Sequence, residues 1–187
     1  MLFHRKIKVP DCVFKAEKRV LHVSDTPVSF YRTFDEILNL IKPDIIIHTG
    51  DLADDIKLER KPWLKKEYEN ALIKFKNIIR GRIVYLVPGN EDDKEIIREI
   101  LGRDVILVNP GTIIEIYGRT FALGHKPEDV KGKEAEFKLY GHDPKSLFPF
   151  NGIHAIHIIL FPEWKVVKIR YPSWVNYDRG YRIFRGL

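Results

Sequence analysis

Five residues whose side chains commonly bind metal ions occur where predicted strands end: Asp25, Asp51, Asn90, His125 and His142. Aspartate, asparagine and histidine supply the oxygen and nitrogen donors that manganese, zinc and iron bind. Each residue alone has an ordinary explanation, because an aspartate after a strand is often a helix cap and a single histidine is more often structural. Five such residues at successive strand ends predict a metal site.

The segment 44–51 is the strongest local signal in the chain. Its run of isoleucines lies between Pro43 and Gly50, which is typical of a buried parallel strand with both faces covered. Gly50 lets the backbone turn, so we expect Asp51 just beyond the carboxyl end of the strand. Ligands of open α/β sheets bind at that edge, and a carboxylate there suits a hard or borderline metal ion.

The first half of the chain alternates between predicted strands and helices. Strands are expected at 19–23, 44–49 and 82–87, and helices at 34–41, 62–80 and 94–100. This alternation favours parallel pairing with right-handed crossovers. The second half favours a short strand at 105–108 and two hairpins, 112–117 with 120–123 around Gly118-Arg119, and 153–161 with 165–171.

Composition predicts a globular protein in which residues 1–187 form a single domain. The chain is 44% apolar and 31% charged, and no apolar run approaches the roughly 20 residues that span a bilayer. We expect no signal peptide and no membrane partner, and the single cysteine, Cys12, fits a reducing, cytoplasmic location. Many Ile, Lys and Glu residues resemble thermophile composition. The net charge is +6 with both signs interspersed, which favours solvated faces over a nucleic-acid surface.

The short motifs together resemble the ordered motif set of calcineurin-like metallophosphoesterases, in particular the small prokaryotic phosphodiesterase branch. The resemblance extends from about Arg19 to about Tyr171 and rests on Ser24-Asp25-Thr26, Gly50-Asp51, Gly89-Asn90-Glu91-Asp92, Gly124-His125 and Gly141-His142. It implies an α/β fold, a four-layer αββα sandwich of two mixed sheets. It also implies two metal ions bridged by the carboxylate of the Gly-Asp motif, here Asp51.

Two departures from the family pattern fall on the same metal site. The histidine of the first motif is replaced by Pro27, and the second histidine of the last motif by Pro144. That site keeps only Asp25 and Asp51. By the same resemblance, the other site is complete as Asp51, Asn90, His125 and His142. We therefore expect one tightly held divalent ion, most favourably manganese, with zinc, iron or nickel as alternatives, and a degraded second site that is weak or absent.

Glu91 and Asp92 complete the predicted catalytic set together with Asp25. Many family members carry a proton-donating histidine at the position of Glu91. A glutamate there could act as a general acid if its pKa were raised, or accept a hydrogen bond from water, and an exposed loop glutamate without a catalytic role is an equal alternative. Asp92 matches an acid of the family, and we expect it to orient groups of the loop.

Other histidines are interpreted as structural. His154 and His157 are three residues apart in a predicted strand, so they point to opposite faces and cannot both bind one ion. His22 and His48 lie inside strands, where burial and hydrogen bonding are expected. The C-terminal segment 171–185 interleaves aromatic residues with arginines. It could hold bases and phosphates, but aromatics that cover the sheet, with arginines facing water, are favoured.

The sequence thus predicts a metal-dependent phosphoesterase that hydrolyses a phosphodiester or small phosphomonoester with metal-activated water. The expected partner is a small phosphoester substrate, with nucleic acid less favoured, and the sequence leaves the oligomeric state open. The alternative is a catalytically weak or inactive relative that binds nucleic acid or a protein partner. The Pro27 and Pro144 replacements favour this alternative, whereas the complete second site and Asp25 favour the enzyme.

Overall fold

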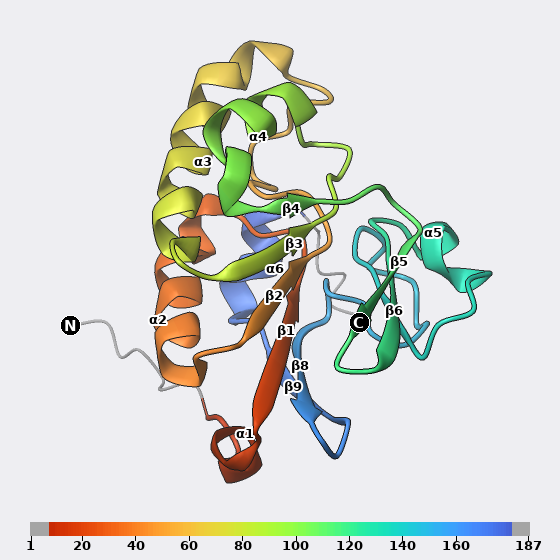
Figure 1. Ribbon diagram of the computed structural model, residues 1–187. Coiled ribbons are helices and arrows are strands. Elements are labelled where there is room, and N and C mark those ends of the chain that lie inside the picture. Colours follow the sequence, from red (N-terminus) through yellow and green to blue (C-terminus); the bar gives the residue numbers. More distant parts are fainter. Residues whose placement is uncertain (1–7, 181–187) are drawn as a thin grey trace, which may run out of the picture.

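The computed structural model describes residues 8–180, which form two β-sheets with helices packed outside them (Figure 1). The larger sheet has the strand order β4-β3-β2-β1-β8-β9, and the smaller has the order β5-β6-β7. The strands are β1 (Lys18–Val23), β2 (Ile45–His48), β3 (Ile83–Leu86), β4 (Ile106–Leu107), β5 (Thr112–Ile116), β6 (Arg119–Leu123), β7 (Phe137–Leu139), β8 (Ala155–Phe161) and β9 (Lys165–Arg170).

Both sheets mix parallel and antiparallel pairs. Strands β1 to β4 are parallel, with Val20 opposite Ile45 and Ile45 opposite Ile83. Strand β8 runs antiparallel to β1, and β9 antiparallel to β8. In the smaller sheet, β5 and β6 form an antiparallel hairpin while β6 and β7 are parallel. The parallel first half and the hairpin-rich second half are therefore confirmed.

Helices flank the sheets on their outer faces. They are α1 (Asp11–Lys15), α2 (Tyr31–Ile41), α3 (Lys65–Ile79), α4 (Lys94–Ile100), α5 (Pro127–Lys131) and α6 (Ser173–Asp178), with short 3-10 helices at Val28–Phe30, Pro62–Leu64 and Gly102–Asp104. Figure 1 shows α2, α3 and α4 along one side of the larger sheet and α5 beyond the smaller one. Among residues 8–180, no helix has both the length and the apolar character that crossing a bilayer requires.

The core consists of three apolar clusters. Alternate residues of a strand face opposite sides of the sheet, so neighbouring residues belong to different clusters. In β2, Ile46 packs toward the helices, whereas Ile45 and Ile47 pack between the two sheets. This double burial explains the uninterrupted isoleucine run. A small third cluster, made of Ala122, Val130 and Tyr140, lies between the smaller sheet and α5. The result is the expected αββα arrangement of four layers.

Local details differ from the sequence-based expectations, most clearly at one helix start and one hairpin turn. The helix expected over residues 62–80 begins at Lys65, and Trp63, within the expected range, lies in a preceding 3-10 helix and is 72% exposed. The first hairpin turns at Tyr117-Gly118, one residue earlier than expected, with φ of 51° and 78°. Two consecutive left-handed residues match the twist of the flanking strands, which outweighs the preference of Tyr117 for negative φ.

A group of buried histidines lies beneath the carboxyl ends of the central strands. His22 Nε2 is 2.9 Å from Thr49 Oγ1, and its Nδ1 is 3.3 Å from Nδ1 of His157. His48 Nε2 is 3.0 Å from Thr26 Oγ1. The expectation that His22 and His48 are buried and hydrogen-bonded is confirmed. Burial, followed by the charge of Lys168, lowers the pKa of His157 to about 4.

We predict that His157 makes the protein acid-sensitive. An unfolded histidine has a pKa of about 6.5, so between that pH and about 4 the unfolded state binds a proton that the folded state does not. Stability is complete above this window and falls as pH falls through it, by about 1.4 kcal/mol per pH unit. His157→Gln should remove this component of the slope. Denaturant unfolding of both proteins from pH 4.5 to 6 checks this, and parallel stability curves would contradict it.

Candidate metal centre

The five candidate ligands lie in loops directly after five different strands. Asp25, Asp51 and Asn90 follow β1, β2 and β3 of the larger sheet, whereas His125 and His142 follow β6 and β7 of the smaller one. The carboxyl ends of parallel strands share one edge of a sheet, and here the corresponding edges of the two sheets meet. One donor atom from each of Asp25, Asp51, His125 and His142 can be chosen so that all lie within 4.8 Å of one another.

The His125 ring connects the remaining candidates. Its Nδ1 is 2.8 Å from the Thr49 carbonyl oxygen, so Nδ1 carries the proton and donates it there. This bond fixes the ring and turns Nε2 toward the cluster. Nε2 lies 3.0 Å from Asn90 Oδ1 and 3.4 Å from Asp51 Oδ2. Asn90 therefore belongs to the same cluster through its amide oxygen.

Glu59 sets the orientation of the Asn90 amide. The Asn90 Nδ2 group donates a 2.8 Å hydrogen bond to Glu59 Oε2, which leaves Oδ1 facing His125. Glu91 in turn holds this part of the chain, because its Oε2 accepts a 2.9 Å bond from the Glu59 backbone N–H. Sequence reasoning missed Glu59, which no local pattern distinguishes from other loop glutamates.

The Glu91 side chain is 5% exposed, so the alternative of an exposed loop glutamate is wrong. Its burial follows from the bond to the Glu59 backbone, and its own N–H donates to Asp51 Oδ1 at 2.9 Å. Glu91 therefore links the loop after β3 to both Asp51 and the segment around Glu59. Its role as a proton donor stays a prediction.

Asp92 joins the loops that follow β2 and β3. Its Oδ2 accepts hydrogen bonds from the backbone N–H groups of Asp51 and Gly89, both at 2.8 Å. Its Oδ1 accepts from the Leu52 N–H at 2.9 Å and the Tyr68 hydroxyl at 2.8 Å. Asp92 thus connects the two loops through four accepted hydrogen bonds, and its role in the site stays a prediction.

The backbone around the cluster adopts conformations that non-glycine residues seldom use. Asp25, Asp51 and His142 have φ of 52°, 54° and 67°, in the left-handed region that is uncommon outside glycine. Glycines provide space beside them. A Cβ at Gly89 would lie 2.1 Å from Asp51 Oδ1, and one at Gly141 would lie 2.3 Å from Asp25 Oδ2. The Gly residues of these motifs therefore permit close approach of loop backbone to carboxylate.

Arg179 is a second residue that sequence reasoning missed. It is 1% exposed, and its guanidinium donates to the carbonyl oxygens of Asp25 at 2.6 Å and Ser24 at 2.9 Å. It also lies 4.2 Å from the centre of the Tyr171 ring. The expectation that the C-terminal arginines face water is wrong for Arg179, because its donors satisfy carbonyls of the loop after β1. Tyr181 to Arg185 lie outside the described residues.

Burial and neighbouring charges shift the pKa values of several ionisable side chains in and beside the cluster. Burial raises the pKa of Asp51 to about 6, against the opposing effect of His125. Although burial alone would lower it, the hydrogen bond and charge of Asp51 raise the pKa of His125 to about 10. Burial and then the charge of Asp25 raise the pKa of Asp54 to about 8. Each of these shifts reduces the net negative charge of the buried cluster, because burial disfavours an ionised carboxyl and a neighbouring carboxylate favours a protonated imidazole.

The arrangement fits a divalent metal ion. Ligand bonds of about 2.0–2.2 Å place opposite donors roughly 4 Å apart, comparable with the 4.8 Å spread of the donor atoms. The buried Asp25 Oδ1 accepts no hydrogen bond from any described residue, although a buried carboxylate oxygen normally has a partner. His154 and His157 are not in the group; His154 Nε2 instead lies 3.2 Å from the Ser146 carbonyl oxygen.

Comparison with known proteins agrees with this geometry. The family model described as calcineurin-like phosphoesterase matches residues 18–183. The chain belongs to the calcineurin-like phosphoesterase family. Members of this family are hydrolases that act on phosphoester bonds with the help of divalent metal ions.

Individual relatives are more distant. The DNA double-strand break repair protein Mre11 of Methanocaldococcus jannaschii is 32% identical over 142 residues, which are 67% of this chain and 37% of that protein. The chain thus spans little more than a third of this relative's length. One crystal structure shares the fold with a TM-score of 0.54 at 10% identity, covering 83% of this chain and 99% of the other. The phosphoesterase YfcE from E. coli aligns with a TM-score of 0.49 at 13% identity, over 82% and 100% of the two chains.

The two prolines that depart from the family pattern suit their local backbone. Pro27 has φ of −70° and immediately precedes the 3-10 helix Val28–Phe30. Pro144 follows Asp143, whose carbonyl oxygen accepts a 3.2 Å bond from the Ser146 N–H, so the proline is the second residue of a turn. Proline favours that turn position because its φ is already fixed. At both positions, therefore, the chain lacks the imidazole of the family pattern and has a proline that fits the local backbone.

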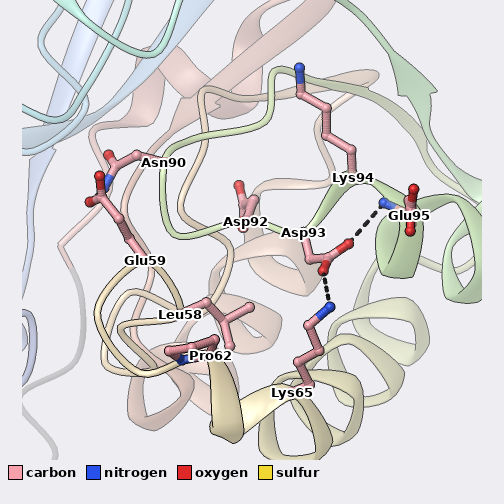
Figure 2. Close-up of a pocket in the computed structure, with 9 residues that line it drawn as sticks. All are labelled: Leu58, Glu59, Pro62, Lys65, Asn90, Asp92, Asp93, Lys94 and Glu95. Carbon is pink, nitrogen blue, oxygen red and sulfur yellow. Dashed lines mark hydrogen bonds and ion pairs between the residues drawn. The ribbon is translucent and has the colours of Figure 1, made fainter.

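A pocket of about 450 Å³ adjoins the cluster at Asn90 (Figure 2). Its lining combines two lysines with four acids and three other residues: Lys65, Lys94, Glu59, Asp92, Asp93, Glu95, Leu58, Pro62 and Asn90. Lys65 pairs with Asp93 at 3.0 Å. The pocket therefore presents more negative than positive side chains.

We predict that Asp92→Ala destabilises the fold at this centre. The change leaves three backbone N–H groups and the Tyr68 hydroxyl without their acceptor, and should lower the free energy of unfolding by about 3 kcal/mol. Tyr68→Phe, which removes one of the four bonds, should cost about 1 kcal/mol. Denaturant unfolding measures both, and equal losses would contradict the assignment.

Proposed function

We propose that this chain is a metal-dependent phosphoesterase that hydrolyses a small phosphodiester or phosphomonoester. Its complete metal site consists of Asp51, Asn90, His125 and His142, and Asp25 belongs to a degraded second site. Manganese is the proposed ion, with zinc, iron or nickel as alternatives, because the donors are a mixture of oxygen and nitrogen atoms. We place its activity in the cytoplasm, where a free Cys12 stays reduced.

One observation carries the proposal. The carboxylates and imidazoles that the family motifs contribute converge from both sheets on one point, within 4.8 Å of each other. Asn90 joins them through an oxygen that Glu59 orients. Chance burial of two acids and two histidines would be costly without a cation, so this convergence supports metal binding.

The proposed roles follow from the contacts. Asp51, Asn90, His125 and His142 would hold a divalent ion, which would supply Lewis-acid activation of the phosphoester and of the attacking water. His125 is fixed through Thr49, so its Nε2 is presented without rotation. Asp92 and Glu91 form hydrogen bonds with the loops that carry Asp51 and Asn90. We propose that both residues position these ligands. Pre-set ligands reduce the reorganisation required during reaction.

A small substrate is favoured by the pocket beside Asn90. Its size, about 450 Å³, suits a compact leaving group. Four acidic side chains in its lining would repel a polyanion such as DNA. Action on DNA is the second candidate, because the Mre11 relative is named as a DNA double-strand break repair protein.

We predict that metal-free protein hydrolyses bis(4-nitrophenyl) phosphate or 4-nitrophenyl phosphate only after Mn²⁺ is added. His125→Ala should reduce this activity by about 100-fold or more, because an essential ligand is at least as important as the groups that orient it. His154→Ala is the matched control, since His154 is exposed and outside the cluster, and it should retain full activity.

The same assay separates the candidates. Release of 4-nitrophenol with no cleavage of a labelled single-stranded oligonucleotide supports the small substrate, and the reverse result supports DNA. Equal Mn²⁺-dependent activity in folded wild-type and His125→Ala proteins would contradict the proposed function.

A further inference from the structure

Arg179 is a buried cation without an acidic partner among residues 8–180. Its side chain is 1% exposed and forms no ion pair with a described residue. Four hydrogen bonds compensate the charge instead: Nε donates to the Asp25 carbonyl oxygen at 2.6 Å, Nη2 to the Ser24 carbonyl oxygen at 2.9 Å, and Nη1 to the Ile153 carbonyl oxygen at 2.9 Å and to Asn176 Oδ1 at 3.1 Å. A buried charge is costly unless its partners are well placed. Two of these partners belong to the loop that carries a candidate metal ligand.

The helix that directly precedes Arg179 packs against the same loop. In α6, Asp178 Oδ2 accepts a 2.6 Å hydrogen bond from the Ser29 hydroxyl, and the ring centres of Trp174 and Phe30 are 6.2 Å apart. Helix α6 therefore contacts the far end of the loop after β1, whereas Arg179 binds its beginning. These hydrogen bonds join residues that are 149 to 155 positions apart in the sequence. The C-terminal part of the described chain thus holds this loop through tertiary contacts.

Asp25 requires such support, because its backbone conformation is strained. Its φ is 52°, in the left-handed region that is unfavourable for a residue with a side chain. One carboxylate oxygen, Oδ2, accepts hydrogen bonds from the Ser24 hydroxyl and from the His142 N–H, the latter at 3.1 Å. The other oxygen, Oδ1, is buried and accepts none from a described residue, so it is the oxygen left to bind a cation. Of the five candidate ligands, Asp25 alone comes from this loop.

We propose that Arg179 is a positioning residue of the metal centre. By binding the Ser24 and Asp25 carbonyls, it holds the strained turn that keeps a donor oxygen of Asp25 within 4.8 Å of the other donors of the cluster. A guanidinium is suited to this role, because its donors have fixed directions in one plane and its charge strengthens each hydrogen bond. The inference rests on the proposed function and adds to the centre a residue that lies outside every motif recognised in the sequence.

The test measures Mn²⁺ binding to metal-free protein by calorimetry, in a double-mutant cycle with Asp25→Asn, since asparagine tolerates the left-handed backbone. Arg179→Met removes the four hydrogen bonds and should weaken Mn²⁺ binding by about 10-fold. In the Asp25→Asn background, the same change should have little further effect, because Arg179 acts through the Asp25 carboxylate. Arg170→Met is the matched control: it removes an exposed arginine of β9 and should leave Mn²⁺ binding unchanged in both backgrounds.

A second variant guards against a folding defect in Arg179→Met. Arg179→Lys keeps the positive charge but loses the planar set of donors, so its Mn²⁺ affinity should lie between those of the wild type and Arg179→Met. Circular dichroism shows which variants fold, and the Arg179→Lys cycle decides alone if Arg179→Met does not. Unchanged Mn²⁺ affinity in the folded variants would overturn the inference. An equal loss in the wild-type and Asp25→Asn backgrounds would also overturn it, because that result indicates a general effect on the fold.

The two proposals fail in distinguishable ways. A wild-type chain that binds Mn²⁺ and hydrolyses the aryl phosphoesters, without coupling between Arg179 and Asp25, would overturn the role of Arg179 and leave the proposed function standing. Mn²⁺ binding with the expected coupling but without hydrolysis would support the role of Arg179 and contradict the proposed function. A wild-type chain that does not bind Mn²⁺ would contradict both.

Discussion

The burial of like charge is the constraint on which this centre depends. Asp25, Asp51 and Asp54 are all nearly inaccessible to solvent and lie in loops at the same edge of the larger sheet. Acids packed in this way are costly unless protons, hydrogen bonds or cations compensate them. Here His125 is close to Asp51, Lys57 pairs with Asp54, and backbone N–H groups bind the remaining oxygens except two. The two exceptions are Asp25 Oδ1 and Asp54 Oδ2, which accept no hydrogen bond from any described residue.

The loops that carry these acids contain strained backbone conformations, and hydrogen bonds from distant residues stabilise them. Left-handed conformations at Asp25, Asp51 and His142 are unfavourable for side-chain-bearing residues. Arg179 binds the carbonyl of Asp25 from the C-terminal helix region, and Asp92 binds the N–H of Asp51 from the next loop. Both supports come from residues distant in sequence. The rigid sheets fix where each loop begins, and these long-range bonds fix where each donor atom points.

Sequence reasoning predicted the parts of this fold that local signals determine. The isoleucine run of β2, the Gly-Asp that follows it and the apolar period of α2 are each readable within a few residues. The loops that supply the cluster were predicted because each begins where such a strand ends. Arg179 could not be found in this way, since its environment comes from contacts with the loop after β1. Trp63 illustrates the opposite error: it lies in the 3-10 helix that precedes α3 and is exposed, and the spacing of apolar residues does not show where the α-helix begins.

We propose that donor atoms from both sheets form one complete divalent-metal site. A crystal structure of the protein grown with Mn²⁺, with anomalous scattering recorded to locate manganese, would show whether the ion binds there. We expect a fully occupied ion about 2.2 Å from donor atoms of Asp51, Asn90, His125 and His142. Manganese bound elsewhere, or no anomalous peak between these four residues at saturating Mn²⁺, would contradict it.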